Sequence, residues 1–141
     1  MSHTLTDEAR QYIAVFEDIT DAQAVDCVVD DEYERVLYVV STGEMAQAIG
    51  PDGSRVSRLE EALGRDVELV EDAPTPEGFV ANALAPAAVY NVTISENNDT
   101  VAYAEVDHDD KGVAIGSGGR NIEGAKRLAA RHFDIDDIQL T

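Results

Sequence analysis

Two segments that lie sixty-six residues apart share one pattern, and this repeat constrains the fold more than any other feature of the chain. Residues 49–56 read IGPDGSRV and residues 115–122 read IGSGGRNI, so both follow I-G-x-x-G-x-x-[IV]. In each segment a pair of glycines interrupts a helical run, and a second run with apolar residues at helical spacing follows at once. Glycines at both ends of a four-residue turn permit positive φ and close approach of another backbone. The pattern therefore predicts helix, tight turn, helix, twice in one chain.

Each predicted turn ends where the second helix begins. The first amide groups of a helix lack partners inside the helix, and the helix dipole places partial positive charge at the same end. A phosphate is stabilised in that position. The repeat therefore predicts two anion sites of the same design.

The elements on either side of the glycines also repeat. The first half predicts a helix at 5–20, strands at 24–30 and 35–41, helices at 43–49 and 53–64, and a strand at 66–71. The second half predicts a helix at 76–85, strands at 89–95 and 100–106, helices at 109–115 and 119–132, and a strand at 135–140. Both halves have the order α-β-β-α-α-β.

The proline pair Pro74 and Pro76 marks the boundary, which predicts one domain at 1–72 and another at 73–141. Halves of about 70 residues are small for independent cores. Because the connection is short and stiff as well, we expect the two halves to have a fixed arrangement.

The chain is strongly acidic, with 29 acidic and ten basic residues and a net charge of −19. This balance argues against a general nucleic-acid binder. Two interpretations remain: an ordinary acidic protein with protein partners, or a protein adapted to a cytoplasm of very high salt. Acidic residues are spread through the whole sequence and only two lysines occur, which favours the high-salt interpretation.

Basic residues gather around the two repeats. Residues 45–65 hold three basic and three acidic residues, and residues 111–132 hold five basic residues and one acidic one. The rest of the chain holds two basic and 25 acidic residues. The two repeat segments are therefore the parts of the chain that do not repel a polyanion.

No pattern in the sequence predicts an enzyme. The three histidines are far apart in sequence, and Asp107, Asp109 and Asp110 lack the spacing of a calcium loop, so we predict no catalytic residue, no metal site and no cofactor. The single cysteine, Cys27, lies in an alternating apolar run and fits a core position in a reducing compartment. We find neither a targeting pattern nor an apolar run long enough to span a bilayer, which predicts a soluble cytoplasmic protein without a membrane partner.

With its two glycine segments and their flanking elements, the chain resembles tandem type II KH domains. Over nearly its whole length it is similar to the archaeal NusA-like transcription termination/antitermination factors. The resemblance implies an α+β fold in which each domain has a three-stranded sheet covered by helices on one face. It further implies single-stranded RNA laid across both domains in transcription elongation, termination or antitermination. RNA polymerase or other transcription factors are possible partners, and we expect a monomer from a haloarchaeal source.

The resemblance places the RNA site at the two loops and the helices that follow them. The predicted RNA-binding residues are Gly50, Pro51, Asp52, Gly53, Ser54, Arg55, Arg58, Gly116, Ser117, Gly118, Gly119, Arg120, Asn121, Gly124, Arg127 and Arg131. On one helix, Arg120, Gly124, Arg127 and Arg131 fall on a single stripe, and Gly124 would let a sugar-phosphate approach between the arginines. The bases of the RNA would lie on an apolar groove beside the loops. Along its edge we expect Ile49, Val56, Ile115 and Ile122, for which core positions are an equal alternative.

The two loops differ in charge. KH loops commonly carry a basic residue in the middle, whereas the first loop has Pro51 and Asp52 and the second has Ser117 and Gly118. Asp52 would face a phosphate, so the second copy is the better RNA-binding candidate. The alternative is a KH scaffold with weakened RNA binding that docks on RNA polymerase or the ribosome through its acidic surface.

Overall fold

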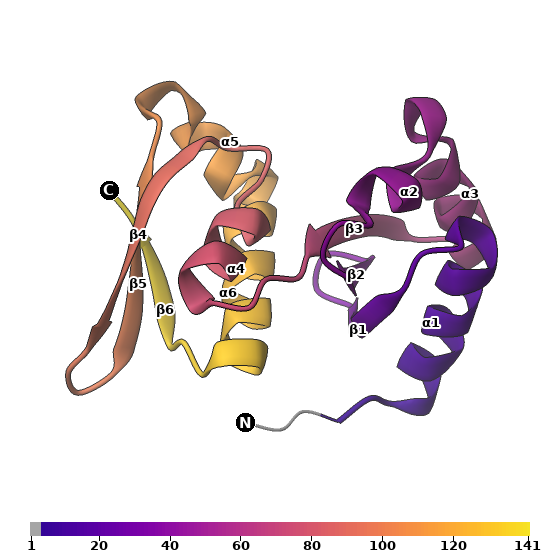
Figure 1. Cartoon of the computed structure of the whole chain (residues 1–141), viewed down its shortest axis with the longest axis horizontal. Helices are drawn as coiled ribbons and strands as arrows, with labels where there is room; N and C mark the ends of the chain where they lie inside the picture. Colours follow the sequence, from indigo (N-terminus) through magenta and orange to yellow (C-terminus); the bar gives the residue numbers. More distant parts are fainter. Residues whose placement is uncertain (1–3) are drawn as a thin grey trace. The chain divides into compact units, whose positions relative to one another are not determined.

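A computed structural model describes residues 4–141, and this part of the chain divides into two compact units, residues 4–72 and 73–141. Each unit has a three-stranded sheet with helices against one face (Figure 1). The predicted α+β class and the order α-β-β-α-α-β are confirmed in both units.

The first unit contains α1 (Asp7–Thr20), β1 (Ala24–Asp30), β2 (Arg35–Val40), α2 (Met45–Ile49), the 3-10 turn η1 (Pro51–Gly53), α3 (Ser54–Leu63) and β3 (Asp66–Glu71). The sheet order is β1-β2-β3, with β1 antiparallel and β3 parallel to β2. Parallel neighbours cannot be joined by a tight turn, so the chain crosses over from β2 to β3 through α2, η1 and α3. The glycine turn lies in the middle of this crossover.

The second unit repeats this plan. It contains α4 (Pro76–Ala83), β4 (Val89–Glu96), β5 (Thr100–Val106), η2 (His108–Asp110), α5 (Lys111–Ile115), η3 (Ser117–Gly119), α6 (Arg120–Phe133) and β6 (Asp137–Leu140). The sheet order is β4-β5-β6, again with one antiparallel and one parallel pair. The predicted helix at 109–115 is divided in the structure, because a 3-10 turn precedes the five residues of α5.

Apolar side chains pack the helices of each unit into its core. In the first unit Phe16 of α1 stacks on Tyr38 of β2 at 4.6 Å between ring centroids, and Leu59 of α3 is fully buried in the same cluster. The predicted core position of Cys27 is confirmed, since it is buried in this cluster too.

In the second unit Phe79 of α4 is fully buried and its ring lies 5.4 Å from that of Phe133 on α6.

Within residues 4–141, every helix is too short or too polar to cross a lipid bilayer.

Candidate nucleic-acid interface

The two glycine turns have the same backbone conformation. Gly50 ends α2 at φ 77°, ψ 171°, and Gly116 ends α5 at φ 78°, ψ 168°. This region is essentially restricted to glycine. The second glycine of each turn, Gly53 or Gly119, is left-handed and donates its amide hydrogen bond to the carbonyl of the first at 3.1 Å. The repeat seen in the sequence is therefore a repeat of one backbone corner.

The middle of each turn is also left-handed, and here the two loops differ in side chain. Asp52 has φ 54°, ψ 29°, and Gly118 has φ 61°, ψ 19°. Aspartate and asparagine tolerate this conformation better than most residues do. Asp52 and Gly118 are both exposed, as are Pro51 and Ser117. The first loop thus presents a carboxylate where the second presents bare backbone.

The helices that leave the two turns have glycine N-caps, unlike the first helix of each unit. Thr6 caps α1 by accepting the amide hydrogen of Ala9 at 3.0 Å, and Thr75 caps α4 by accepting that of Gly78 at 3.1 Å. Gly53 and Gly119, which precede α3 and α6, have no side chain that could do the same. The N-termini of α3 and α6, where the helix dipole is positive, therefore lack the side-chain oxygen that caps α1 and α4.

The residue five positions after the first glycine holds each corner closed. The guanidinium of Arg55 donates to the carbonyl oxygen of Gln47 at 2.6 Å, across Gly50. In the second unit the amide of Asn121 donates to the carbonyl oxygen of Ala114 at 3.1 Å, across Gly116. These contacts join the start of the second helix to the end of the first. They give Arg55 and Asn121, both predicted RNA contacts, a role inside the protein that the sequence did not suggest.

The predicted stripe on α6 is only partly as expected. Arg127 is exposed, and Arg120 and Arg131 are half-buried on the same side of the helix. Gly124 is buried, so the prediction that it leaves an open approach for a sugar-phosphate is wrong. The buried arc of α6 is wider than the sequence suggested, because Leu128 extends it towards the arginines and Gly124 falls within it.

The four groove candidates separate into two kinds. Ile49 and Ile115, each just before the first glycine, are 39% and 44% exposed. Ile122 is buried, and Val56 is half-buried against the core of the first unit. The apolar surface beside each loop therefore comes from the isoleucine that ends the short helix.

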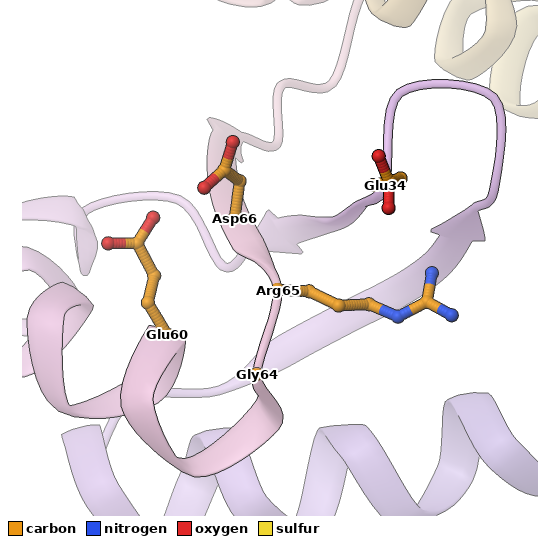
Figure 2. Close-up of a pocket in the computed structure, with 5 residues that line it drawn as sticks. All are labelled: Glu34, Glu60, Gly64, Arg65 and Asp66. Carbon is orange, nitrogen blue, oxygen red and sulfur yellow. The ribbon is translucent and has the colours of Figure 1, made fainter.

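In the first unit Ser54 and Arg58 are exposed on α3. At the far end of this helix is a hollow of about 410 Å³, lined by Glu34, Glu60, Gly64, Arg65 and Asp66. Figure 2 shows the side chain of Arg65 turned away from the carboxylates of Glu60 and Asp66. Its guanidinium donates to Asp31 at 2.9 Å, and this hydrogen bond raises the pKa of Arg65. Because Arg65 is paired and the three other charged residues of the lining are acidic, the hollow does not suit a phosphate.

Two carboxylates near the turns were missed by the sequence analysis. Glu44, at the start of α2, accepts the amide hydrogen of Gln23 at 2.7 Å, and Asp110, at the start of α5, accepts that of Ala88 at 2.8 Å. Both bonds tie a short helix to the residue just before an edge strand. The signal was present, because Glu44 and Asp110 are sixty-six residues apart, as the glycine turns are.

Family models match both units of this chain. A KH domain model matches residues 10–80, and a model of the NusA-like second KH domain matches residues 76–141. The chain is thus a protein of two tandem KH domains.

Full-length relatives make the assignment more specific. The chain is 73% identical over 141 residues to the probable transcription termination protein NusA of Halobacterium salinarum, and 64% identical over 140 residues to that of Halococcus morrhuae, with 99% or more of every chain covered. The crystal structure of APE1850 matches with a TM-score of 0.86 and 35% identity, covering 97% of this chain and 100% of that one. The chain belongs to the family of archaeal NusA-like transcription termination proteins. The haloarchaeal source of these two relatives supports the high-salt interpretation of its acidic composition.

Proposed function

We propose that this chain binds single-stranded RNA through its two glycine turns, residues 50–53 and 116–119, and acts in this way during transcription elongation, termination or antitermination. The domain boundary in this proposal lies between residues 72 and 73. The observation that carries the proposal is the duplicated corner, in which a backbone conformation restricted to glycine leads into a helix with a glycine N-cap. KH domains use such a GxxG loop to clamp about four nucleotides of backbone.

The second loop supplies most of the affinity in this proposal. Gly118 leaves the middle of that loop without a side chain, and Arg120, Arg127 and Arg131 follow on one side of α6. In the first loop Asp52 sets a negative charge at the equivalent position, and Arg55 is directed back to the carbonyl of Gln47. The first loop then extends the RNA footprint and contributes less binding free energy.

The same features of the first loop favour a second candidate function for the first unit. A loop with a carboxylate at its centre and an arginine turned inward suits a protein partner better than a phosphate. In this alternative the first unit docks on RNA polymerase or the ribosome, and the second unit alone holds RNA.

RNA binding can be measured by fluorescence anisotropy with a short A-rich or U-rich strand at several KCl concentrations. At 1 M salt the screening length is about 3 Å, so contacts survive while long-range attraction does not. For a basic protein that binds a single strand, the logarithm of the binding constant falls by about 0.7 per neutralised phosphate for each tenfold rise in salt concentration. Because this chain has few cations, we expect its RNA affinity to fall less steeply with salt than that of a basic protein with several phosphate contacts. A steep loss between moderate and high KCl, with the fold intact by circular dichroism, would contradict this mode of binding.

The transcription role can be measured in a reconstituted reaction with the archaeal RNA polymerase and a template that carries a terminator. We expect the added chain to change the fraction of transcripts that end at the terminator. The change should disappear when the second loop carries Gly118→Asp, because RNA would no longer be held there. An unchanged fraction, or a change that persists in the variant, would argue for a role without RNA contact at this loop.

A further inference from the structure

The edge strand of each sheet carries a bulge at the same place. Pairing of β1 with β2 shifts register between Ala24 and Asp26, and pairing of β4 with β5 shifts between Val89 and Asn91. The extra residues are Val25, which is 43% exposed, and Tyr90, which is 66% exposed. Bulges near functional sites commonly redirect a side chain. Both units thus turn one large side chain outwards at equivalent positions, and only the second unit uses an aromatic one.

Hydrogen bonds hold the ring of Tyr90 beside the helix that leads into the second glycine turn. Its hydroxyl donates to the carboxylate of Asp107, whose other oxygen accepts the amide hydrogen of Asp109 at 2.9 Å. Two residues before Tyr90, the amide of Ala88 donates to Asp110 at the start of α5. The ring is therefore fixed at Asp107, just before η2, and Gly116 lies beyond the far end of α5, which follows η2.

One RNA strand held at the second loop is long enough to reach this ring. Between Asp107 and Gly116 lie the three residues of η2, at about 2 Å each, and the five residues of α5, at about 1.5 Å each, which together correspond to about 13–14 Å. A KH loop clamps about four nucleotides, which span a comparable length at about 3.4 Å per nucleotide of a stacked strand. A strand held at residues 116–119 can therefore bring one of its bases to Tyr90. Ile115, which is also exposed, lies at the loop end of the same helix.

The charges around Tyr90 decide which part of the strand it can receive. The carboxylates of Asp107, Asp110 and Glu105 all act on its hydroxyl, and the bond to Asp107 is the main cause of its raised pKa. A phosphate would be repelled there, whereas the face of a base is uncharged. Aromatic rings stack on bases of every kind.

We propose that Tyr90 is a base-stacking site, on which one nucleobase lies while the phosphates of the same strand lie at the second glycine turn. The site rests on the RNA binding proposed above. It adds an RNA contact outside the loop and its helices. It also gives the bulge in β4 a function, which is to expose the ring of Tyr90.

Replacement of the ring tests the proposal in full-length protein at high KCl, with a fluorescent octamer of A-rich RNA as the probe. Tyr90→Ala should weaken binding about tenfold, as expected for one lost stacking contact. Tyr90→Phe should lose much less affinity than Tyr90→Ala, because it keeps the ring and loses only the hydroxyl that holds it. Tyr103→Ala is the matched control: this tyrosine is 40% exposed on β5, where it pairs with Thr93 and Gln139. Its loss should leave affinity unchanged.

The salt dependence distinguishes stacking from phosphate binding. Tyr90→Ala should lower affinity by the same factor at each KCl concentration, because the ring neutralises no phosphate. If Tyr90→Phe loses as much affinity as Tyr90→Ala, the bond to Asp107 is what matters and the stacking site is refuted. If Tyr90→Ala binds like the parent while Gly118→Asp does not, only this inference fails. If the parent protein binds no RNA, the proposed function fails and the stacking site with it.

Discussion

Gly118→Asp is expected to weaken binding of a short single-stranded RNA about a hundredfold, corresponding to about 2.7 kcal/mol. The residue lies at the exposed centre of the second loop, where a phosphate would meet the backbone amides of η3 and α6. A hydrogen bond to a charged group contributes about 1.5–3 kcal/mol, and an aspartate would both compete for those amides and repel the phosphate. Anisotropy titration at high KCl measures the effect.

The backbone at this position allows a clean control. Gly118 has φ 61°, ψ 19°, and Asp52 already occupies the equivalent position at φ 54°, ψ 29°, so an aspartate can adopt the conformation. An added Cβ at Gly118 meets no atom within 4 Å. Gly118→Asn has nearly the same shape as Gly118→Asp without its charge, and asparagine suits left-handed backbone. It should retain most of the affinity. Equal losses in both variants would show that bulk at this position, and not charge, prevents binding.

The reverse change in the first loop completes the comparison. Asp52→Asn removes the carboxylate and leaves the backbone able to keep its left-handed turn. If the first loop contacts RNA, this change should raise affinity, by less than Gly118→Asp lowers it. An unchanged affinity would favour the alternative in which the first unit serves a protein partner.

Gly116→Ala is expected to destabilise the second unit by about 2–4 kcal/mol, since the residue has backbone angles that cost a side chain about 1–3 kcal/mol. The new Cβ would also lie 2.8 Å from the backbone nitrogen of Asn121. That nitrogen belongs to the first turn of α6 and cannot move without opening the corner. Denaturant unfolding at high KCl measures the loss, and RNA affinity should fall with it because the corner positions the loop.

Two further glycines serve as references for this change. Gly112→Ala lies on the same short helix, where an added Cβ meets nothing within 4 Å. Alanine is the better helix former by about 0.5–1 kcal/mol, so this variant should be as stable as the parent or slightly more so. Gly50→Ala should fall between the two, because its Cβ would meet the flexible side chain of Arg55 at 2.7 Å instead of backbone. A Gly116→Ala variant as stable as Gly112→Ala would show that the corner is not held as described.

Much of this fold could be predicted because its signals are local. The strands at 66–71 and 100–106 agree with the prediction to the residue, since each is a run of alternating or β-branched residues bounded by polar turns. Helix α1 ends at residue 20 as predicted and begins two residues later than predicted, after its N-cap Thr6. The glycine turns could be located because no other residue suits the angles of Gly50 and Gly116.

The features that were missed depend on contacts between residues distant along the chain. Gly124 is buried because α6 packs a wide arc, including Leu128, inside its unit. Arg55 and Asn121 turn inward because the corner brings carbonyl groups of the preceding helix within reach of their side chains. Neither hydrophobic periodicity nor composition gives the direction of a polar side chain that could point either to solvent or back to the protein backbone.

The sequence by itself determined where this chain turns, which segments are helix or strand, and that one design occurs twice, because glycine conformation and hydrophobic periodicity act over a few residues. Only the tertiary structure decided which polar groups close the corners and which face outward. The bulge that exposes Tyr90 arises from strand pairing, and the bond that holds its ring joins residues seventeen positions apart. Packing and the hydrogen-bonding requirements of buried polar groups determine these features. Both depend on contacts that form only when segments distant in the sequence come together.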